Sequence, residues 1–441
     1  RSLLDQAQAE QIEGLLDGSF GVTAAASDTR THTVSPFAAV GTTNIQLGYQ
    51  MRQPLANGDS ITASMLMVRS MQKYPATTPL AFRSLLNPLY QSQIDLIWRT
   101  PLLKGRGNPD YHQQRSAARY ATEADSWQIE VVRYQLAGEV LAAFFQHRIN
   151  RIRVQLAKDA RHRAQQLLYY QRKQERFGLI EPADRLQSEA LLAQRVTDLV
   201  QAQAALSASA IQLQRLLAAD RVPQQLEVSS HTTESLPTLS QLEQIADDNR
   251  PEYRLLAARL AAADAELERA EAADATQLDL VGQVGTRGQE GLFKRAFRSG
   301  LSVSHRFAQL SLELSDSVGS HSEQAAIQRA EVAREQVVVQ QAQTARKIGD
   351  SLALIRSSVE TGRRLLHAYT RQVEAEREKF RAEMLRYRAG RSDTATIIQF
   401  EGDLRRVTLQ QALQEESLKL ASYQLRLARG DWSVMQSKQN H

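Results

Sequence analysis

The chain has 441 residues, no cysteine and a formal net charge of +5 at pH 7. The absence of cysteine excludes disulfide bonds, cysteine-ligated zinc, cysteine nucleophiles and a lipid-modified N-terminal cysteine in this sequence. Positive and negative charges are interspersed, and no apolar run reaches the length of a transmembrane helix, so neither a nucleic-acid-binding protein nor a helical membrane protein is indicated. No secretory signal peptide precedes the polar start at Arg1, so we expect a mature or trimmed chain.

The first part of the chain, about 18–107, alternates apolar and polar residues with the period of two that is typical of β-strands. Near its end, Ile94, Leu96 and Trp98 alternate with Asp95 and Arg99, which predicts a strand with one apolar and one polar face. Such a pattern fits either a soluble β-sandwich or a transmembrane β-barrel with a wet lumen.

A long helical segment follows at about 111–176, then a short turn at 177–184 and a return helix at 185–219. The long helix would extend roughly 100 Å at about 1.5 Å per residue. In the return helix, apolar and alanine positions recur at spacings of three and four residues, which predicts close packing like that of a coiled coil.

The second half repeats this order. A linker and helical segment at 220–273 leads to strands at about 276–317, a long helix at about 322–388, a turn at 389–394, a return helix at 395–429 and a polar tail. Gly178 in the first turn recurs as Gly390 in the second, about 212 residues later. We therefore predict an internal duplication, with a first repeat at 1–219 and a second at 220–441.

Two features of the second strand region lead to further structural predictions. The runs 300–307 and 310–314 both alternate but with different parity, so a bulge or turn is expected between two strands. The glycine-rich stretch 282–291 is not followed by a helix start at the position that a nucleotide-binding loop requires, and we interpret it as a loop between strands.

About four strands in each chain are too few to close a barrel. A spanning sheet must be closed, because an open edge leaves backbone groups unpaired in lipid. Three chains would supply about twelve strands, an even number within the range of bacterial barrels. The predicted fold is therefore a mixed all-α plus β-barrel membrane protein, a trimer forming a 12-stranded β-barrel that continues into a long α-helical barrel.

The order and spacing of these elements resemble the TolC family of outer-membrane efflux proteins. The resemblance rests on the duplicated unit, on "PLLKGRG" at 101–107, on "NRPEYRLLAARLAAADAELERAEA" at 249–272, and on the two glycine turns, "FGLIEPADRLQSEALL" and "YRAGRSDTATIIQFEGDL". It implies a homotrimer in the outer membrane of a Gram-negative bacterium, in contact with outer-membrane lipid, with a large periplasmic extension. It also implies a passive exit duct that serves a periplasmic adaptor (membrane fusion) protein and an inner-membrane pump of the ABC or RND type, for drug efflux or type I protein secretion.

The resemblance further implies a periplasmic gate at the two turns. In the family, a tyrosine before the second turn and an arginine after it tie down the inner hairpin through an aspartate after the first turn. Aligned on the glycines, these residues fall on Tyr387 and Asp184, while the arginine position falls on Ser392, beside Arg391.

The same alignment predicts a docking surface and an entrance. The turns that would meet the adaptor contain Gly178, Leu179, Gly390, Arg391 and Ser392. Two entrance aspartates of the family fall on Thr396 and Gln399, so an acidic ring is not expected there; Glu181 and Asp393 would supply negative charge nearby.

No enzyme chemistry is indicated. The nine histidines are scattered without metal-ligand spacing, and no nucleophile motif occurs, so we predict no catalytic, metal or cofactor site and no enzyme. The alternative function is a trimeric periplasmic coiled-coil scaffold without transport activity, whose strands form a soluble head. A duct would need detergent for extraction, whereas such a scaffold would be soluble.

Overall fold

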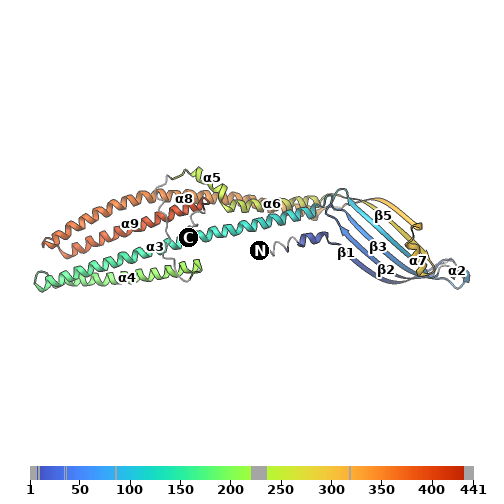
Figure 1. The fold of residues 1–441 in the computed structure, drawn as a ribbon, viewed down its shortest axis with the longest axis horizontal. Helices are drawn as coiled ribbons and strands as arrows, with labels where there is room; N and C mark the ends of the chain where they lie inside the picture. Colours follow the sequence, from blue (N-terminus) through green and yellow to red (C-terminus); the bar gives the residue numbers. More distant parts are fainter. Residues whose placement is uncertain are drawn as a thin grey trace, which may run out of the picture. The chain divides into compact units, whose positions relative to one another are not determined.

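The computed structural model describes residue 7 and residues 10–33, 35, 37–84, 87–219, 236–316 and 319–431 (Figure 1). Residues 220–235 of the predicted linker and helical segment, and residues 432–441 of the predicted polar tail, lie outside the described residues. The chain forms two compact units, and each takes residues from both sequence halves. We call Arg1–Asp125 with Leu256–Gln340 the sheet unit, and Ser126–Leu255 with Gln341–His441 the hairpin unit.

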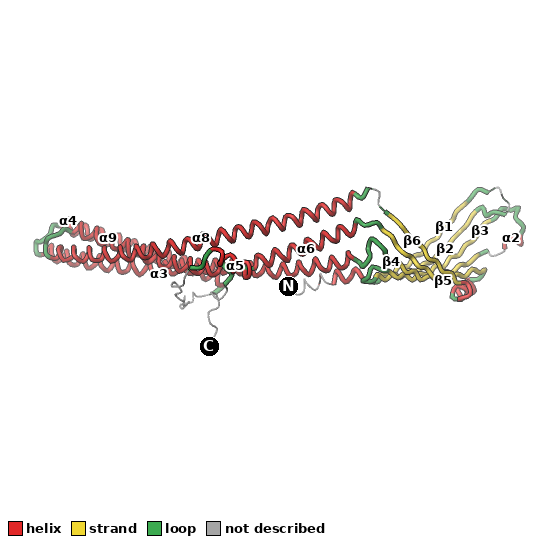
Figure 2. The backbone as a smooth tube through the Cα atoms, turned by 90° about the horizontal axis from the view of Figure 1, so that it is seen from above, coloured by secondary structure: helices red, strands yellow, loops and turns green. Residues whose placement is uncertain are grey.

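The sheet unit contains a six-stranded antiparallel sheet in which every strand pairs with its neighbours in chain order (strands in yellow in Figure 2). Its strands are β1 (Ser19–Arg30), β2 (Gly41–Pro54), β3 (Ser60–Lys73), β4 (Leu89–Pro101), β5 (Gln277–Glu290) and β6 (Arg306–Ser315). The expected number of about four strands per chain is therefore wrong. The expectation of twelve strands rested on four strands in each of three chains, whereas the described residues of this chain form six.

Two local predictions in the second strand region are also corrected. The glycine-rich stretch 282–291 is not a loop, since residues up to Glu290 belong to β5. The run 300–307 is not a strand over most of its length: α7 (Phe293–Gly300) and the 3₁₀ turn η2 (Val303–His305) precede β6. This helix and turn explain the change of parity, because only the residues from Arg306 onward follow the pleat of the sheet.

The register gives the sheet two chemically distinct faces. Leu96 lies opposite Ala63 on β3 and Val284 on β5, and these side chains share one face. The apolar face carries Phe20, Val22, Ile45, Leu47, Tyr49, Met51, Ile61, Met65, Met67, Ile94, Leu96, Trp98, Val284, Leu310, Leu312 and Leu314. Most of these large apolar side chains are exposed, including Leu310 at 72% and Phe20 at 78%. An exposed apolar surface of this extent indicates that something outside this single chain covers it.

The polar face holds charged groups that contact one another across strands. Asp95 and Asp279 are buried on this face, at 8% and 3% exposure. Arg99 on β4 donates to Asp279 on β5 at 2.7 Å and forms an ion pair with Glu313 on β6 at 2.8 Å. The alternation of Ile94, Leu96 and Trp98 against Asp95 and Arg99 thus places them on opposite faces of the sheet.

The two ends of the sheet differ. Three helices begin or end within a few residues of the same end, which we call the helical end; they are α3 (Pro109–Arg176), α6 (Pro251–Ala273) and α8 (His321–Arg388). The other end, the loop end, carries the β1–β2 connection, α2 (Leu80–Ser84) and α7. Trp98 lies near the helical end of the apolar face and Tyr90 near its loop end.

The hairpin unit pairs most of α3 with α4 (Pro182–Leu217) and α8 with α9 (Thr394–Ala428), while α5 (Leu239–Asn249) packs beside α8 and α9. Its core joins the two hairpins: Phe144 and Phe145 on α3 and Leu213 on α4 contact Leu420 and Tyr423 on α9. A second cluster contains Leu242, Ala246, Ile348, Leu352, Val359, Leu418, Leu425 and Ala428. None of the described helices is long and apolar enough to cross a membrane.

Candidate gate at the two helical turns

The two turns end their long helices in the same way. Gly178 and Gly390 have φ angles of 69° and 71°, in the left-handed region that favours glycine. In the residue after Gly178, the Leu179 N–H donates to the Gln174 carbonyl at 3.1 Å. In the residue after Gly390, the Arg391 N–H donates to the Arg386 carbonyl at 2.9 Å. These bonds are those of a Schellman cap. Glycine therefore ends each of the two long helices in a left-handed cap.

The return helices begin with different caps. Asp393 precedes α9, and its carboxylate accepts from the Thr396 backbone N–H at 2.7 Å and from the Thr396 hydroxyl at 3.0 Å. The backbone N–H of Thr396 holds the pKa of Asp393 below its usual value. Glu181 precedes α4, where Pro182 occupies the first turn and the Glu181 side chain makes no cap bond.

A buried polar cluster joins the hairpins just inside the turns. Gln171 on α3 is fully buried, and its amide donates to the Thr394 hydroxyl at 2.7 Å and to the Tyr387 hydroxyl at 3.1 Å. Tyr387 and Thr394 lie 3.3 Å apart through their hydroxyls, one on each helix of the second hairpin. The cluster therefore ties the first hairpin to both helices of the second. Buried polar groups that are paired in this way fix one arrangement, because separating them in place would leave them unsatisfied.

The three predicted latch residues make no hydrogen bond or ion pair with one another within the described part of one chain. Tyr387 bonds Gln171 and Thr394, and no bond from it to Asp184 is found among the described residues. Asp184 lies half-buried in the first turn of α4, and Arg391 is exposed at the second turn. Within one chain, the structure thus brings Tyr387 together with Gln171 rather than with Asp184.

Farther along the helices from the turns, a series of ion pairs connects α9 to the first hairpin. We call this series the ladder. Glu401 on α9 pairs with Arg163 on α3 at 3.1 Å and with Arg195 on α4 at 3.1 Å. The side chains of Arg195 and Glu401 are only 5% and 9% exposed. Arg405 on the next turn of α9 pairs with Asp198 on α4 at 3.1 Å. Such buried charges need their partners, because removing one leaves the other uncompensated.

Further along the same helices, Arg148 on α3 reaches Glu416 on α9 with two hydrogen bonds, of 2.8 and 3.0 Å. Glu416 is 3% exposed and also accepts from Lys419 at 3.0 Å. Two parallel bonds between a guanidinium and a carboxylate give a fixed geometry. The ladder therefore extends from Glu401 to Glu416 and sets the register between α3 and α9.

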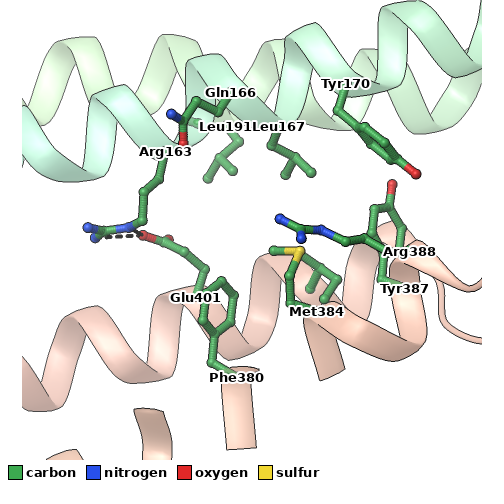
Figure 3. A pocket seen from close by; sticks show the side chains of 12 residues that line it. Arg163, Gln166, Leu167, Tyr170, Leu191, Phe380, Met384, Tyr387, Arg388 and Glu401 are labelled. Carbon is green, nitrogen blue, oxygen red and sulfur yellow. Dashed lines mark hydrogen bonds and ion pairs between the residues drawn. The ribbon is translucent and has the colours of Figure 1, made fainter. Parts of the chain in front are cut away.

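A cavity of about 290 Å³ lies between the ladder and the polar cluster (Figure 3). Arg163 and Glu401 close one side of it, and Tyr170 and Tyr387 close the other (Figure 3). Apolar side chains such as Met384 line the space between them. Polar contacts thus hold the hairpins together on two sides of this space, which the side chains leave unfilled.

The residues predicted for docking and for the entrance all lie at or just after the turns. Leu179 is 67% exposed, and Phe177 beside it, which sequence reasoning did not select, is 69% exposed. Thr396 is held by Asp393, whereas Gln399 is exposed on the second turn of α9. The turn of the first hairpin thus presents two apolar side chains to its surroundings.

Sequence reasoning also missed Gln171 and the ladder partners of Glu401. Each is a polar residue in an apolar helical stripe, which is the signal that could have drawn attention to them. Their pairing joins residues more than 200 positions apart, and the sequence of one helix does not show which partner the other offers. No group of three or more histidine, aspartate or glutamate side chains able to hold a metal ion occurs in the described part of the chain.

The chain was compared with known proteins. No protein-family profile and no curated protein matches the sequence. Solved structures do match. The match to the outer-membrane channel OprN has 18% identity and a TM-score of 0.63, and it covers 98% of this chain and 85% of the OprN chain. The outer membrane protein VceC from Vibrio cholerae, at 15% identity and a TM-score of 0.60, covers 97% and 90%, respectively. The open state of the Neisseria gonorrhoeae outer membrane channel MtrE, at 16% identity and a TM-score of 0.58, covers 97% and 84%.

At these identities the likeness concerns the fold, and it extends over nearly the whole of this chain and most of each channel. In this chain, the order of two strand regions and two long helical hairpins is the order that the sequence predicted. The chain therefore has the fold of these outer-membrane channels, which is the fold expected from its resemblance to the TolC family.

Proposed function

We propose that the protein is the outer-membrane exit duct of a tripartite export machine in a Gram-negative bacterium. The observation that carries the proposal is the two-faced sheet in a chain with the fold of outer-membrane channels. Apolar side chains cover one face, and Asp95, Arg99 and Asp279 lie on the other. This is the alternation of a transmembrane strand with one side to lipid and one to water.

The dimensions of the apolar face support this reading. The run from Tyr90 to Trp98 on β4 is close to the length of about 9–11 residues that a tilted strand needs to cross a bilayer. Trp98 at the helical end and Tyr90 at the loop end would stand at the two membrane–water interfaces, where aromatic side chains are enriched. The helical end would then face the periplasm.

Closure of the sheet requires further copies of the chain. β1 and β6 are its edges, and in a six-stranded meander they run in opposite directions. The β6 edge of one copy and the β1 edge of the next would therefore pair antiparallel, like every other pair in the sheet. In the proposed homotrimer, three copies of a six-stranded sheet would supply eighteen strands, instead of the twelve expected from the sequence.

The helical turns would serve the partners of the duct. We assign adaptor docking to the two turns, where Gly178 and Gly390 are exposed, Ser392 lies two residues after Gly390, and Leu179 presents an apolar side chain. The partners would be a periplasmic adaptor and an inner-membrane pump of the ABC or RND type. The duct itself would bind no cofactor and would conduct its cargo passively, either drugs or a secreted protein. Glu181, Asp393, Thr396 and Gln399 would lie near the entrance.

The assembly is tested with the purified protein. In detergent it should have the mass of three chains, and a cryo-electron microscopy map should show eighteen strands in one closed barrel. If the protein instead has the alternative function, that of a coiled-coil scaffold with a soluble head, it should be extracted without detergent and should not insert into membranes. A detergent-corrected mass of one chain, or a protein that stays soluble without detergent, would contradict the duct.

The gate is tested by conductance. We propose that Tyr387, through Gln171 and Thr394, and Arg391, paired with Asp184 of a neighbouring copy, hold the closed state. Replacing Tyr387 with Phe and Arg391 with Ser removes one hydroxyl and one charge in each copy, and threefold symmetry multiplies the effect. Single-channel conductance in planar bilayers should rise several-fold, because the population shifts toward the open state. Unchanged conductance of a correctly inserted double variant would show that other contacts hold the gate.

A further inference from the structure

The helix α7 lies on the apolar face of the sheet, at its loop end (Figure 1). The Ser92 hydroxyl on β4 donates to the Ala296 carbonyl at 2.6 Å, and the Thr286 hydroxyl on β5 bonds the Gly300 carbonyl. Ser92 is two residues from Ile94, and Thr286 is two residues from Val284. Because alternate residues of a strand point to the same face, Ser92 and Thr286 belong to the apolar face. The helix is therefore fixed to the surface that we propose to face lipid.

Glycines allow this close contact. A Cβ at Gly288 would lie 2.3 Å from the Ala296 carbonyl oxygen, and a Cβ at Gly300 would lie 2.0 Å from the Ser92 hydroxyl. The ring of Tyr90 packs edge-on to that of Phe293, with the two ring centroids 6.0 Å apart, and Phe293 stacks with Phe297. The helix is thus held by backbone approach and by aromatic packing, and its placement is part of the fold rather than that of a loose loop.

The opposite side of α7 is basic. Lys294, Arg295 and Arg298 are exposed, whereas Ala296 is 2% exposed against the sheet. None of the three makes an ion pair within the described residues. The sequence contains no acidic residue between Glu290 and Glu313, so nothing in this segment neutralises them.

Two arginines of the sheet extend this basic surface. Arg69 on β3 lies opposite Ile45 and Tyr90, and Arg306 on β6 lies opposite Thr286, so both have the parity of the apolar face. Arg69 lines a hollow beside Phe293 and Phe297, and its buried Nε has no hydrogen-bond partner in the described structure. We call Arg69, Lys294, Arg295, Arg298 and Arg306 the basic rim.

We propose that the basic rim binds the phosphate groups of the anionic glycolipid of the outer leaflet, with α7 lying in the headgroup layer. The inference rests on the proposed function, because it requires the apolar face to be in the outer membrane. The loop end is then the outer end, since the helical end faces the periplasm.

Two physical arguments select this ligand. Uncompensated cations on a lipid-facing surface are costly at the depth of the hydrocarbon, so α7 must lie at the interface, where a basic amphipathic helix binds by its apolar side and its charges together. At that depth on the outer surface, the available anions are lipid phosphates. Guanidinium groups match phosphate geometry with two bonds, and clusters of lysine and arginine are the usual means of recognising anionic lipid headgroups.

The test uses the full-length protein in detergent and diphosphoryl lipid A as the probe, with native mass spectrometry to count bound lipid. We expect wild type to bind diphosphoryl lipid A at least about tenfold more tightly than the variant K294Q/R295Q/R298Q. The charge-retaining variant K294R/R295K/R298K should keep most of the affinity. The matched control R364Q/R377Q/R381Q removes three charges from the exposed surface of α8 and should bind as wild type does.

The outcomes separate this inference from the proposed function. Failure of wild type to float with phosphatidylcholine vesicles would overturn the membrane function itself. If wild type floats but binds diphosphoryl lipid A no better than the α7 variant, or binds the dephosphorylated lipid equally well, the basic rim is not a phosphate site. Equal loss in the α8 control would likewise overturn it, because the binding would then depend on net charge alone.

Discussion

Replacing Glu401 with Gln is expected to weaken the contact between the two hairpins more than any other single change in the ladder. The substitution keeps the size of the side chain and removes the charge that Arg163 and Arg195 share. Arg195 is nearly fully buried and would keep only Asp198 as an acidic partner, at 3.3 Å. The uncompensated charge should lower the free energy of unfolding by about 3 kcal/mol, measured by urea titration of the detergent-solubilised protein.

The control is Glu360 on α8, whose side chain is 52% exposed and pairs with Arg364 on the same helix at 3.2 Å. Replacing Glu360 with Gln should change the free energy of unfolding by less than about 1 kcal/mol, as exposed pairs do. Equal effects of the two substitutions would show that the Glu401 contacts contribute no more than a surface ion pair. Replacing Arg163, Arg195 and Glu401 together with apolar residues should restore much of the stability, because no buried charge then remains.

The helices and turns were largely predictable from the sequence. The long helix expected at about 322–388 forms at His321–Arg388, and the glycines of the two expected turns end their helices in left-handed caps. Such features depend on local rules: periodicity marks the apolar side of a helix, and glycine tolerates the positive φ of its cap. Local rules need no knowledge of the partner segment.

The strands were less predictable, and the reasons are visible in their residues. β1 alternates Phe20, Val22, Ala24 and Ala26 with small or polar residues, and its alanines give a weak signal of a two-faced strand. The helix α7 falls within the region 276–317 that was assigned to strands as a whole, and its eight residues are too few to separate a period of 3.6 from one of two. The register across β4 and β5 joins segments separated by four helices, which no local pattern reveals.

The residues of the candidate site were likewise predictable from the sequence only in part. The residues at the turns were named because the two glycines align this sequence with the turns of the family that it resembles. Gln171, which ties Tyr387 and Thr394 together, was not found, because its significance depends on burial among three helices. A polar residue in the interior of a helical bundle is worth marking in a sequence, since burial obliges it to find a partner.

An arginine at Leu96 is expected to prevent most of the protein from reaching the membrane. Leu96 lies on the apolar face between Ala63 and Val284 and is 48% exposed in the single chain, where the proposed assembly has lipid. An arginine near the middle of the lipid-facing surface costs on the order of 2–4 kcal/mol in each copy. Folding into lipid vesicles, followed by urea titration, should show this loss, and the yield of membrane-extracted trimer should fall.

The matched control is an arginine at Ser64, on the neighbouring strand and the opposite face. Ser64 lies opposite Asp95, and its hydroxyl donates to that carboxylate at 3.4 Å, so an arginine there would meet an acid and a wet lumen. Its effect on membrane insertion should be small by comparison with that of Leu96→Arg. If the two arginines are tolerated equally, the apolar face does not meet lipid, and the assignment of lipid and lumen to the two faces fails. If Ser64→Arg is the more harmful, the faces are reversed, because only a charge placed in lipid carries this cost.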